Sequence, residues 1–343
     1  MYKKKSNQSL KDLNTFSMDV TAKKIIFVNT IQSLIEIWKI CKSYNLPYII
    51  LGEGSNVLFL ENYMGIVIIN RIKGITIQEK KNVWILHVFS GEKWHDLVKY
   101  TMRIGLFGLE NLSLIPGSVG SAAIQNIGAY GLEIKHICEY VDVLSLERNN
   151  IIRLKKNSCQ FSYRNSIFKH KYNNGYAVIA VGIKIKKNWK PIIFPILLKS
   201  KKIIQINAYK IFNIICQTRK SKLPNLKKIG NAGSFFKNPI VTSQIAKNIL
   251  STYINVPHYL QKNGFIKISA AWLIEKCNFK NIQIGDAAIY KKHNLILVNK
   301  KKATGQEILK LAKIIQKSIF KKFKILLEPE IDFINSSGKI KLL

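Results

Sequence analysis

The sequence has no apolar run long enough to cross a membrane. Its most hydrophobic stretches, such as residues 176–185, have about half of the roughly 20 residues that a spanning helix needs. The amino-terminal segment MYKKKSNQSLKDLN also lacks the apolar core of a signal peptide. We therefore expect a cytoplasmic protein that is neither exported nor inserted into a membrane.

Cysteines are few and isolated. They number five, an odd count, and no two have C-x-x-C spacing: Cys41, Cys138, Cys159, Cys216 and Cys277. A disulfide framework needs pairs, and a zinc site needs closely spaced ligands. We expect buried thiols in a reducing compartment, and no metal site.

Acidic residues are scarce, since 19 Asp and Glu face 55 Lys and Arg, which gives a formal charge of +36. Such a balance is typical of nucleic-acid-binding proteins, and a basic nucleic-acid-binding protein is one alternative. The lysines are nevertheless spread along the whole chain, and we see no arginine-rich helix or basic motif interleaved with aromatic residues. Lys, Ile and Asn share A/T-rich codons, so our hypothesis is that drift in base composition raised the charge. We expect no specific nucleic-acid partner.

Length and composition indicate a folded protein of two or three domains. The chain has 343 residues, of which 47% are hydrophobic and 10% are aromatic. A chain of this size exceeds the usual single domain, and a crevice between domains would leave room for a cofactor and a substrate.

Helical and strand-like patterns are mixed along the chain. Helices are expected at about 30–44 (capped by Thr30), 93–105, 207–219, 269–277 and 304–323. Strands are expected at 48–51, 66–70, 83–89, 137–146 and 176–185. The segment 221–234, with Pro224 and two glycines, is a plausible domain boundary. The pattern indicates an α+β fold.

A short glycine turn follows the first of these strands. It reads Gly52-Glu-Gly54-Ser55-Asn56, and its glycines allow the close backbone approach that a phosphate needs. An ordinary glycine turn is the commoner explanation of so short a pattern. Val57 stands where G-x-G-x-x-G would have its third glycine, so a Rossmann site is disfavoured.

A second glycine-rich segment is much longer. It runs from Gly108 to Gly131 and is apolar, without the charge of a linker. Its small and amide residues indicate a buried loop that contacts a phosphorylated ligand, and those we assign to cofactor binding are Gly117, Gly120, Ser121, Asn126 and Gly128.

Several segments together resemble a known family. They read LGEGSNVLFLENYMGIVIINRIKG, IPGSVGSAAIQNIGAYG, FSYRNSIFKH, GNAGSFFKNP and LEPEIDF, and the resemblance extends over about residues 14–333. In this order they resemble the UDP-N-acetylenolpyruvoylglucosamine reductases, in their longer-loop form. The match covers nearly the whole chain, which removes chance agreement of one glycine motif as an explanation.

The resemblance implies an FAD-binding fold of the vanillyl-alcohol-oxidase type with an added C-terminal α+β domain for the substrate. It places FAD-binding subdomains at 1–72 and 73–222 and the substrate-binding domain at 223–324, with a strand near 325–343 that packs back on the first subdomain. Ser55 and Ser121 would face the FAD pyrophosphate.

The implied reaction is the NADPH-dependent reduction of UDP-N-acetyl-3-O-(1-carboxyvinyl)-glucosamine to UDP-N-acetylmuramate through bound FAD, in peptidoglycan synthesis. The expected partners are the UDP-sugar and NADPH, and the expected state is a monomer. Another FAD-dependent oxidoreductase or oxidase of the same fold is the nearest alternative.

The family pattern gives three residues catalytic roles. Arg164 would hold the carboxylate of the enolpyruvyl group with its planar guanidinium. Ser234 would donate a proton, and Glu330 would hold the enolic form of the intermediate or relay a proton. Without the family pattern, these would be read as a surface arginine, a turn serine and a surface glutamate.

The pattern also assigns substrate contacts to Lys222, Asn238 and Tyr259. The chain departs from the pattern in two places. A second loop tyrosine is absent from the stretch PIIFPI after the 176–187 strand, and His293 stands where a glutamine is expected. These departures concern substrate affinity and closure of the site, whereas the redox core matches.

Overall fold

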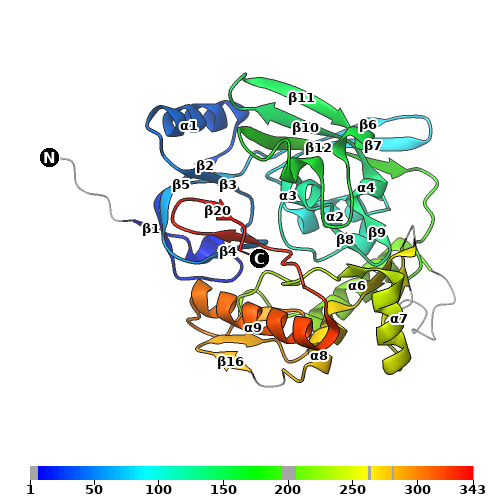
Figure 1. Cartoon of the computed structure of the whole chain (residues 1–343). Helices are drawn as coiled ribbons and strands as arrows, with labels where there is room; N and C mark the ends of the chain where they lie inside the picture. The colour runs from blue at the N-terminus through cyan, green and yellow to red at the C-terminus, as the bar shows by residue number, and fades with distance from the viewer. Residues whose placement is uncertain (1–6, 195–205, 262–263, 280–281, 343) are drawn as a thin grey trace. The chain divides into compact units, whose positions relative to one another are not determined.

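The chain forms two compact units in the computed structural model, which describes residues 7–194, 206–261, 264–279 and 282–342. Unit 1 consists of Met1–Lys23, Gly54–Gly65 and Lys222–Leu343, and unit 2 of Lys24–Glu53 and Ile66–Ser221. The chain therefore changes unit after residues 23, 53, 65 and 221. Figure 1 shows the whole chain, coloured from its N-terminus to its C-terminus, with the helices and strands labelled.

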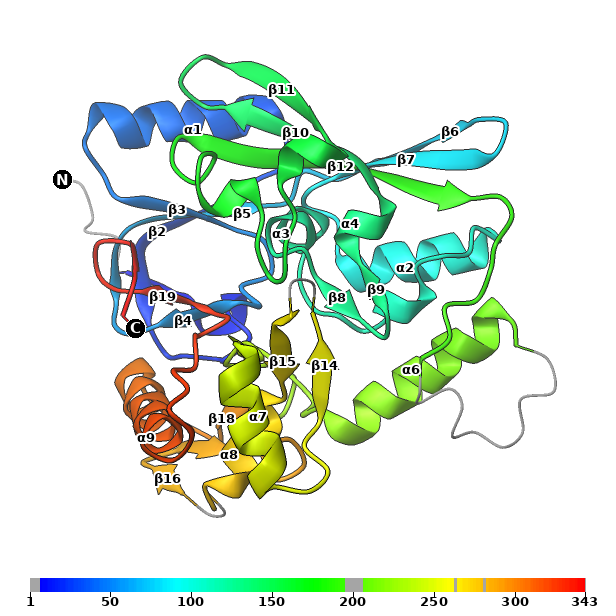
Figure 2. The ribbon, with the colours of Figure 1, turned by 45° about the vertical axis from the view of Figure 1, so that its right-hand side comes forward.

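Unit 1 contains three small sheets. In the first, β4 (Val57–Phe59) runs parallel to β19 (Asp332–Ile334), which also pairs with β20 (Lys339–Ile340). The second has the order β13-β15-β14, with bounds Ile240–Val241, Ile266–Ile268 and His258–Leu260. Helix α7 (Ser243–Thr252) packs against β15, as Figure 2 shows.

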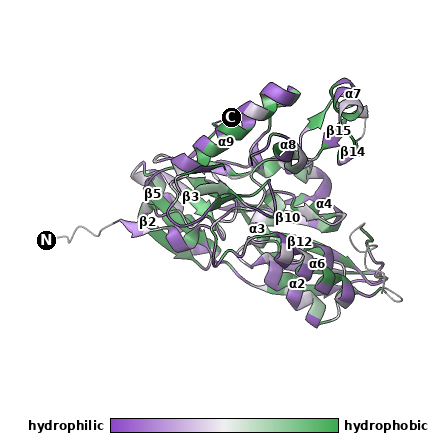
Figure 3. Ribbon diagram, turned by 90° about the horizontal axis from the view of Figure 1, so that it is seen from below, coloured by the Kyte–Doolittle hydropathy of each residue, from purple (hydrophilic) through white to green (hydrophobic). Residues whose placement is uncertain are grey.

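The third sheet of unit 1 packs against the long helix α9 (Gly305–Phe323). Its strands have the order β16-β17-β18, with bounds Gln283–Ile284, Ala287–Ile289 and Leu297–Asn299. Thr304 caps α9 and forms a capping box with Glu307, which satisfies amides at the start of the helix. Hydrophilic and hydrophobic residues alternate along α9 (Figure 3), whose apolar side also meets α8 (Ala270–Lys276).

Unit 2 is built on a five-stranded antiparallel sheet. Its order is β11-β10-β12-β7-β6, with bounds Asn150–Lys155, Cys138–Ser145, Tyr176–Lys186, Val83–Phe89 and Ile75–Glu79. Central strand β12 is buried on both faces, which explains its continuous apolar sequence.

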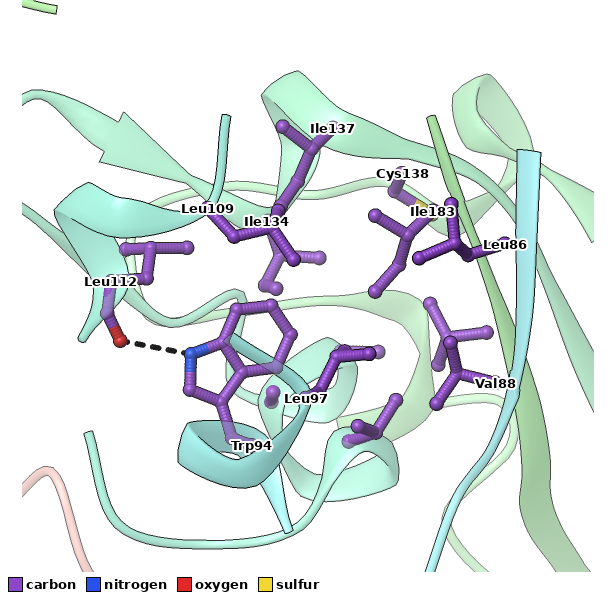
Figure 4. Packing of buried hydrophobic residues seen from close by; sticks show 14 of the residues in the cluster. Leu86, Val88, Trp94, Leu97, Leu109, Leu112, Ile134, Ile137, Cys138 and Ile183 are labelled. Carbon is purple, nitrogen blue, oxygen red and sulfur yellow. Dashed lines mark hydrogen bonds between the residues drawn. The ribbon is translucent and has the colours of Figure 1, made fainter. Parts of the chain in front are cut away.

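One face of this sheet packs against α2 (Trp94–Arg103), α3 (Val119–Ile124) and α4 (Ile134–Ile137). Trp94 lies in the centre of this core, among aliphatic side chains of the helices and strands (Figure 4). Its indole Nε1 donates a hydrogen bond to the carbonyl oxygen of Leu112 at 2.9 Å, so the one polar atom of the ring is satisfied.

The other face contributes to a second core with α1 (Ile31–Ser43). Leu34, Ile35 and Trp38 of α1 pack with Leu144 and Ile179 of the sheet. Three further strands adjoin this core: β2 (Thr21–Val28), β5 (Tyr63–Asn70) and β3 (Tyr48–Leu51), the last of which runs parallel to β5. The remaining elements are α6 (Ala208–Lys222), β1 (Gln8–Ser9), β8 (Gly128–Ala129), β9 (Leu132–Glu133) and the 3-10 turns Lys11–Leu13, Glu110–Leu112, Lys156–Cys159 and Ile167–Lys169.

The predicted α+β content is confirmed, and the ten expected helices and strands are found within a few residues of their predicted bounds. Two expectations were wrong. The glycine-rich segment predicted to be a loop contains α3, because Ser118 caps a helical turn there. The five cysteines are free, but Cys277 is only half-buried.

No helix among the described residues is long and apolar enough to span a bilayer. The predicted division into two FAD-binding subdomains and a substrate-binding domain stays a prediction.

Candidate functional site

In unit 2, the two glycine-rich segments meet at Gly52 and Ser118. A Cβ atom on Gly52 would lie 2.4 Å from the Ser118 Oγ, closer than real Cβ contacts allow. The carbonyl oxygen of Gly52 accepts a hydrogen bond from the Nη1 of Arg71 at 2.9 Å. Only glycine lets the Ser118 side chain approach the backbone at position 52 this closely.

The turn that contains Gly52 is divided between the units, since Glu53 ends a piece of unit 2 and Gly54 begins a piece of unit 1. Within unit 1, Gly54 has a φ of 58°, and a Cβ there would lie 2.1 Å from the carbonyl oxygen of Leu13. The half-buried Ser55 follows this glycine.

Ser118 and Ser121 hold each other at the start of α3. Ser118 accepts from the Ser121 amide at 3.4 Å, and the Ser121 hydroxyl donates to the Ser118 carbonyl oxygen at 2.8 Å. Gly117 has a φ of 112°, and a Cβ on Gly120 would lie 2.7 Å from the Cβ of Ser90. Glycine is therefore required at 117 by the backbone conformation and at 120 by close packing, while Ser121 keeps some exposure.

Asn126 connects this segment to the neighbourhood of Arg164. It is buried, with a left-handed φ of 43°, and its Nδ2 donates to the Ser162 carbonyl and to the Glu133 carboxylate, both at 2.8 Å. Its Oδ1 accepts from the Lys135 amide at 2.9 Å. These internal bonds give Asn126 a structural part, and its predicted contact with a cofactor stays a prediction.

Arg164 lies in a backbone conformation that L-residues adopt only at a cost, with a φ of 53°. Its Nη2 donates to the carbonyl oxygen of Gly128 at 3.2 Å, and the Tyr163 ring lies 5.6 Å from its guanidinium carbon. The Lys169 ammonium donates to the Arg164 carbonyl at 3.0 Å. The guanidinium is therefore held from the side of the predicted glycine-rich segment.

Two residues near Arg164 were missed by sequence reasoning. They are Arg219 of α6 and Tyr130. The positive charge of Arg164 lowers the pKa of Arg219, and Tyr130 is a hydrogen-bond partner of Arg219. The signal in the sequence was the helical spacing of Ile211, Ile215 and Arg219, which places a cation on the apolar side of α6.

In unit 1, Ser234 and Glu330 lie on adjacent segments. The Glu330 amide donates to the Phe235 carbonyl oxygen at 2.8 Å, and Phe236 and Pro329 form a β-bridge. Ser234 is half-buried and is followed by two fully buried phenylalanine rings. The structure thus brings together two of the three predicted catalytic residues in this unit, with Arg164 in unit 2.

Glu330 is also held by Asn56. The Asn56 Nδ2 donates to the Glu330 carbonyl oxygen at 3.2 Å, and the Asn56 carbonyl accepts from the Asp332 amide at 2.9 Å. The predicted phosphate-binding turn and the predicted catalytic carboxylate therefore share one local framework.

The predicted substrate residues of unit 1 differ in their surroundings. Asn238 accepts from the Ala270 amide at 2.9 Å and so caps α8, while Tyr259 is 52% exposed with the Lys267 ammonium 5.5 Å from its ring. Lys222 is exposed. Burial lowers the pKa of His293, and the charge of Lys222 lowers it further, so His293 is neutral near pH 7.

Within the described part of the chain, no group of three or more His, Cys, Asp or Glu is placed to hold a metal ion. The candidate groups are instead Ser121 and Arg164 in unit 2, and the Ser234 hydroxyl and the Glu330 carboxylate in unit 1. Such a set binds and orients anions and exchanges protons.

Family models match both parts of the chain. Residues 22–155 match the FAD binding domain, and residues 224–334 match the C-terminal domain of UDP-N-acetylenolpyruvoylglucosamine reductase. The chain is 78% identical over 344 residues to the UDP-N-acetylenolpyruvoylglucosamine reductase of Buchnera aphidicola subsp. Schizaphis graminum, covering 100% of both chains.

It is 46% identical over 334 residues to the protein of the same name from Escherichia coli K12, covering 97% of this chain and 98% of the relative. Its fold is similar to the crystal structure of UDP-N-acetylenolpyruvylglucosamine reductase from Thermus caldophilus, with a TM-score of 0.66 and 24% identity over 96% of this chain and 98% of the other.

Proposed function

Since this chain belongs to the UDP-N-acetylenolpyruvoylglucosamine reductase family, we propose which of its residues carry out each part of the family's reaction. The protein is an FAD-containing oxidoreductase of peptidoglycan synthesis, and NADPH is its co-substrate. It reduces the enolpyruvyl group of a UDP-sugar. We assign roles in this reaction to individual side chains.

The residues of unit 2 fit a bound dinucleotide. The Ser118 side chain packs directly on the backbone of Gly52, and Ser121, one turn farther along α3, is partly exposed. We assign Gly52, Ser121 and their neighbours Gly117, Gly120 and Gly128 to FAD, together with Gly54, Ser55 and Asn56 in unit 1.

The chemistry supplied by bound FAD is the transfer of a hydride from NADPH to the vinyl carbon of the substrate. The protein's own work begins with the carboxylate on the neighbouring carbon. Arg164 holds this carboxylate with a guanidinium whose geometry matches it, and so favours the negative charge that hydride addition leaves there.

Ser234 then gives its hydroxyl proton to that carbon. A serine hydroxyl is a poor acid in water, but the carbon to which it donates is strongly basic after hydride addition. Glu330 holds the enolic form or relays the proton, and the two buried phenylalanines after Ser234 limit the access of water to this segment.

Lys222, Asn238 and Tyr259 are assigned to the UDP-sugar. The exposed Lys222 ammonium suits a phosphate, and the exposed Tyr259 ring offers a flat surface to the nucleotide. We further propose that the protein works as a monomer in the cytoplasm and has no specific nucleic-acid partner.

The adjacency of Ser234 and Glu330 carries this assignment, because an acid and a carboxylate on neighbouring segments are what the protonation step requires. The test is the visible spectrum of the purified protein under anaerobic conditions. We expect flavin bands that bleach on addition of NADPH and return on addition of UDP-N-acetylenolpyruvoylglucosamine. A colourless protein, or flavin that stays bleached with this substrate, would contradict the proposal.

A further inference from the structure

Helix α6 carries a cation where its packing calls for an apolar residue. Ala208, Ile211 and Ile215 are buried and follow one another at helical spacing. Arg219 lies one turn after Ile215 on the same side. Ile211 and Ile215 pack with Tyr130 and Trp189, so an aliphatic residue at position 219 would extend an existing apolar contact.

Arg219 is a half-buried residue whose Nε is fully buried, and no carboxylate among the described residues neutralises it. Its Nε is inaccessible to solvent and has no hydrogen-bond partner, and among the described residues it forms no ion pair with a carboxylate. Burial lowers its pKa, while Tyr130 and Cys216 oppose this and the positive charge of Arg164 adds to it. Two guanidinium groups therefore repel each other in one region of unit 2.

Tyr130 holds Arg219 in place. Its backbone is left-handed with a φ of 48°, and its carbonyl oxygen accepts from the Asn111 Nδ2 at 2.7 Å. The Phe194 ring meets it edge-on at 5.8 Å. Burial raises the pKa of the Tyr130 hydroxyl, so this group stays neutral and provides a dipole but no negative charge.

A partly buried cation with an unpaired, buried Nε and no counter-charge destabilises a fold, unless a ligand brings the opposite charge. We infer that Arg219 is a second substrate-binding arginine, which joins Arg164 in holding the planar carboxylate of the enolpyruvyl group. This inference rests on the proposed function. Two planar guanidinium groups suit a carboxylate, because each of its oxygens can accept hydrogen bonds from a different donor.

The alternative explanation is that Arg219 has only a structural role, in which it links α6 to Tyr130 through a hydrogen bond. The two explanations predict different changes in the melting temperature when Arg219 is replaced by methionine. If Arg219 is structural, replacing it by methionine removes a useful hydrogen bond and lowers the melting temperature. If Arg219 awaits an anion, Arg219→Met relieves repulsion and extends the apolar side of α6, so the melting temperature without substrate stays equal or rises.

The experiment compares Arg219→Met and Arg219→Lys with the wild type and with Arg148→Met, a control at an exposed arginine. Calorimetric titration without NADPH measures the dissociation constant of UDP-N-acetylenolpyruvoylglucosamine, and thermal unfolding is followed on the same substrate-free proteins. We expect Arg219→Met to raise the dissociation constant by about tenfold to a hundredfold, the range of a charge-assisted hydrogen bond. The dissociation constant of Arg219→Lys should lie between those of Arg219→Met and the wild type. That of Arg148→Met should equal the wild-type value.

UDP-N-acetylglucosamine, which lacks the carboxylate, is the second probe. Its affinity should be the same in Arg219→Met and in the wild type. An equal loss for both ligands would place Arg219 against another part of the nucleotide and overturn the inference, as would unchanged substrate affinity with a lowered melting temperature. Failure of the wild type to reduce the substrate would instead contradict the proposed function.

Discussion

Asn56 holds the backbone of Glu330 from across the chain. Its Nδ2 donates to the Glu330 carbonyl oxygen at 3.2 Å, between residues 274 positions apart in the sequence. The Asn56 carbonyl oxygen accepts from the Asp332 amide at 2.9 Å, next to the parallel pairing of β4 with β19. Asn56 therefore positions the proposed catalytic carboxylate, in addition to its proposed contact with FAD.

Replacing Asn56 by alanine should lower both stability and turnover. The variant loses a partly buried hydrogen bond, which destabilises unit 1 by about 1–2 kcal/mol, and it frees the Glu330 segment to shift. Asn62→Ala is the matched control, because Asn62 also makes one side-chain bond to a backbone, to the Thr21 amide at 2.8 Å, in the same unit. Urea unfolding and kcat would be measured for both. Equal losses of kcat in the two variants would show that Asn56 does not position Glu330.

Replacing Ser234 by alanine should affect the two halves of the reaction unequally. The hydroxyl is needed for protonation of the substrate carbon and has no part in hydride delivery from NADPH. In stopped-flow absorbance we expect flavin bleaching by NADPH to persist, while recovery with the enolpyruvyl substrate slows by at least about a hundredfold. Ser251→Ala, at an exposed serine of α7, is the control. Normal recovery in Ser234→Ala would exclude this serine as the acid.

Replacing Gly52 by alanine should loosen the proposed FAD site. The added Cβ would lie 2.4 Å from the Ser118 Oγ and 3.0 Å from its Cβ, so the Ser118 side chain that caps α3 must shift, at a cost of about 1–3 kcal/mol in the free energy of unfolding. Gly105→Ala is the control, since it has a φ of 76° but no atom within 4 Å of the new Cβ. We expect Gly52→Ala to lose flavin on gel filtration, measured as the ratio of absorbance at 450 and 280 nm. Retention of flavin equal to that of Gly105→Ala would contradict this.

Acid should destabilise unit 2 through His95. Its Nδ1 accepts from the Leu114 amide at 3.1 Å, and its ring stacks on Phe212 with centroids 6.0 Å apart. Burial lowers the pKa of His95, and the charge of Lys99 lowers it further. The unfolded chain therefore binds more protons than the folded chain below about pH 6.5, so the free energy of unfolding falls as the pH falls through this window.

The His95→Gln variant keeps an acceptor for the Leu114 amide and removes the titration. Its free energy of unfolding should drop less between pH 7.5 and 5.5 than that of the wild type, as followed by urea unfolding at both pH values. Part of the drop should remain, because burial also lowers the pKa of His87, His136 and His293. An identical drop in variant and wild type would show that His95 does not contribute to the loss of stability in acid.

Local signals were sufficient to predict the long elements. Thr30 caps its helix as predicted, and the apolar run of β12 is explained by burial on both faces. Short strands such as β13 and β16 were missed, because two residues carry no readable period. Helix α3 was missed because glycine and serine disfavour a helix, and only the cap at Ser118 compensates for them.

The candidate site was predictable only as a set of residue types. The sequence contains Gly52 and Ser118 but does not say that they touch, since this contact follows from the tertiary packing of two loops. Arg219 was missed because it was read as the end of a helix, whereas its spacing from Ile215 already placed it on the apolar side. Family resemblance supplied the roles of Ser234 and Glu330, and their adjacency came from the β-bridge of Phe236 with Pro329.

The parallel pairing of β4 with β19 has a consequence for biosynthesis. Asp332 pairs with Val57, so among the described strands β4 finds its partner only after β19, more than 270 residues later, has left the ribosome. Unit 2 ends at Ser221 and is synthesised in full well before that moment. A nascent chain should therefore fold in two stages, and a product lacking its last two strands would expose an unpaired β4 edge to aggregation.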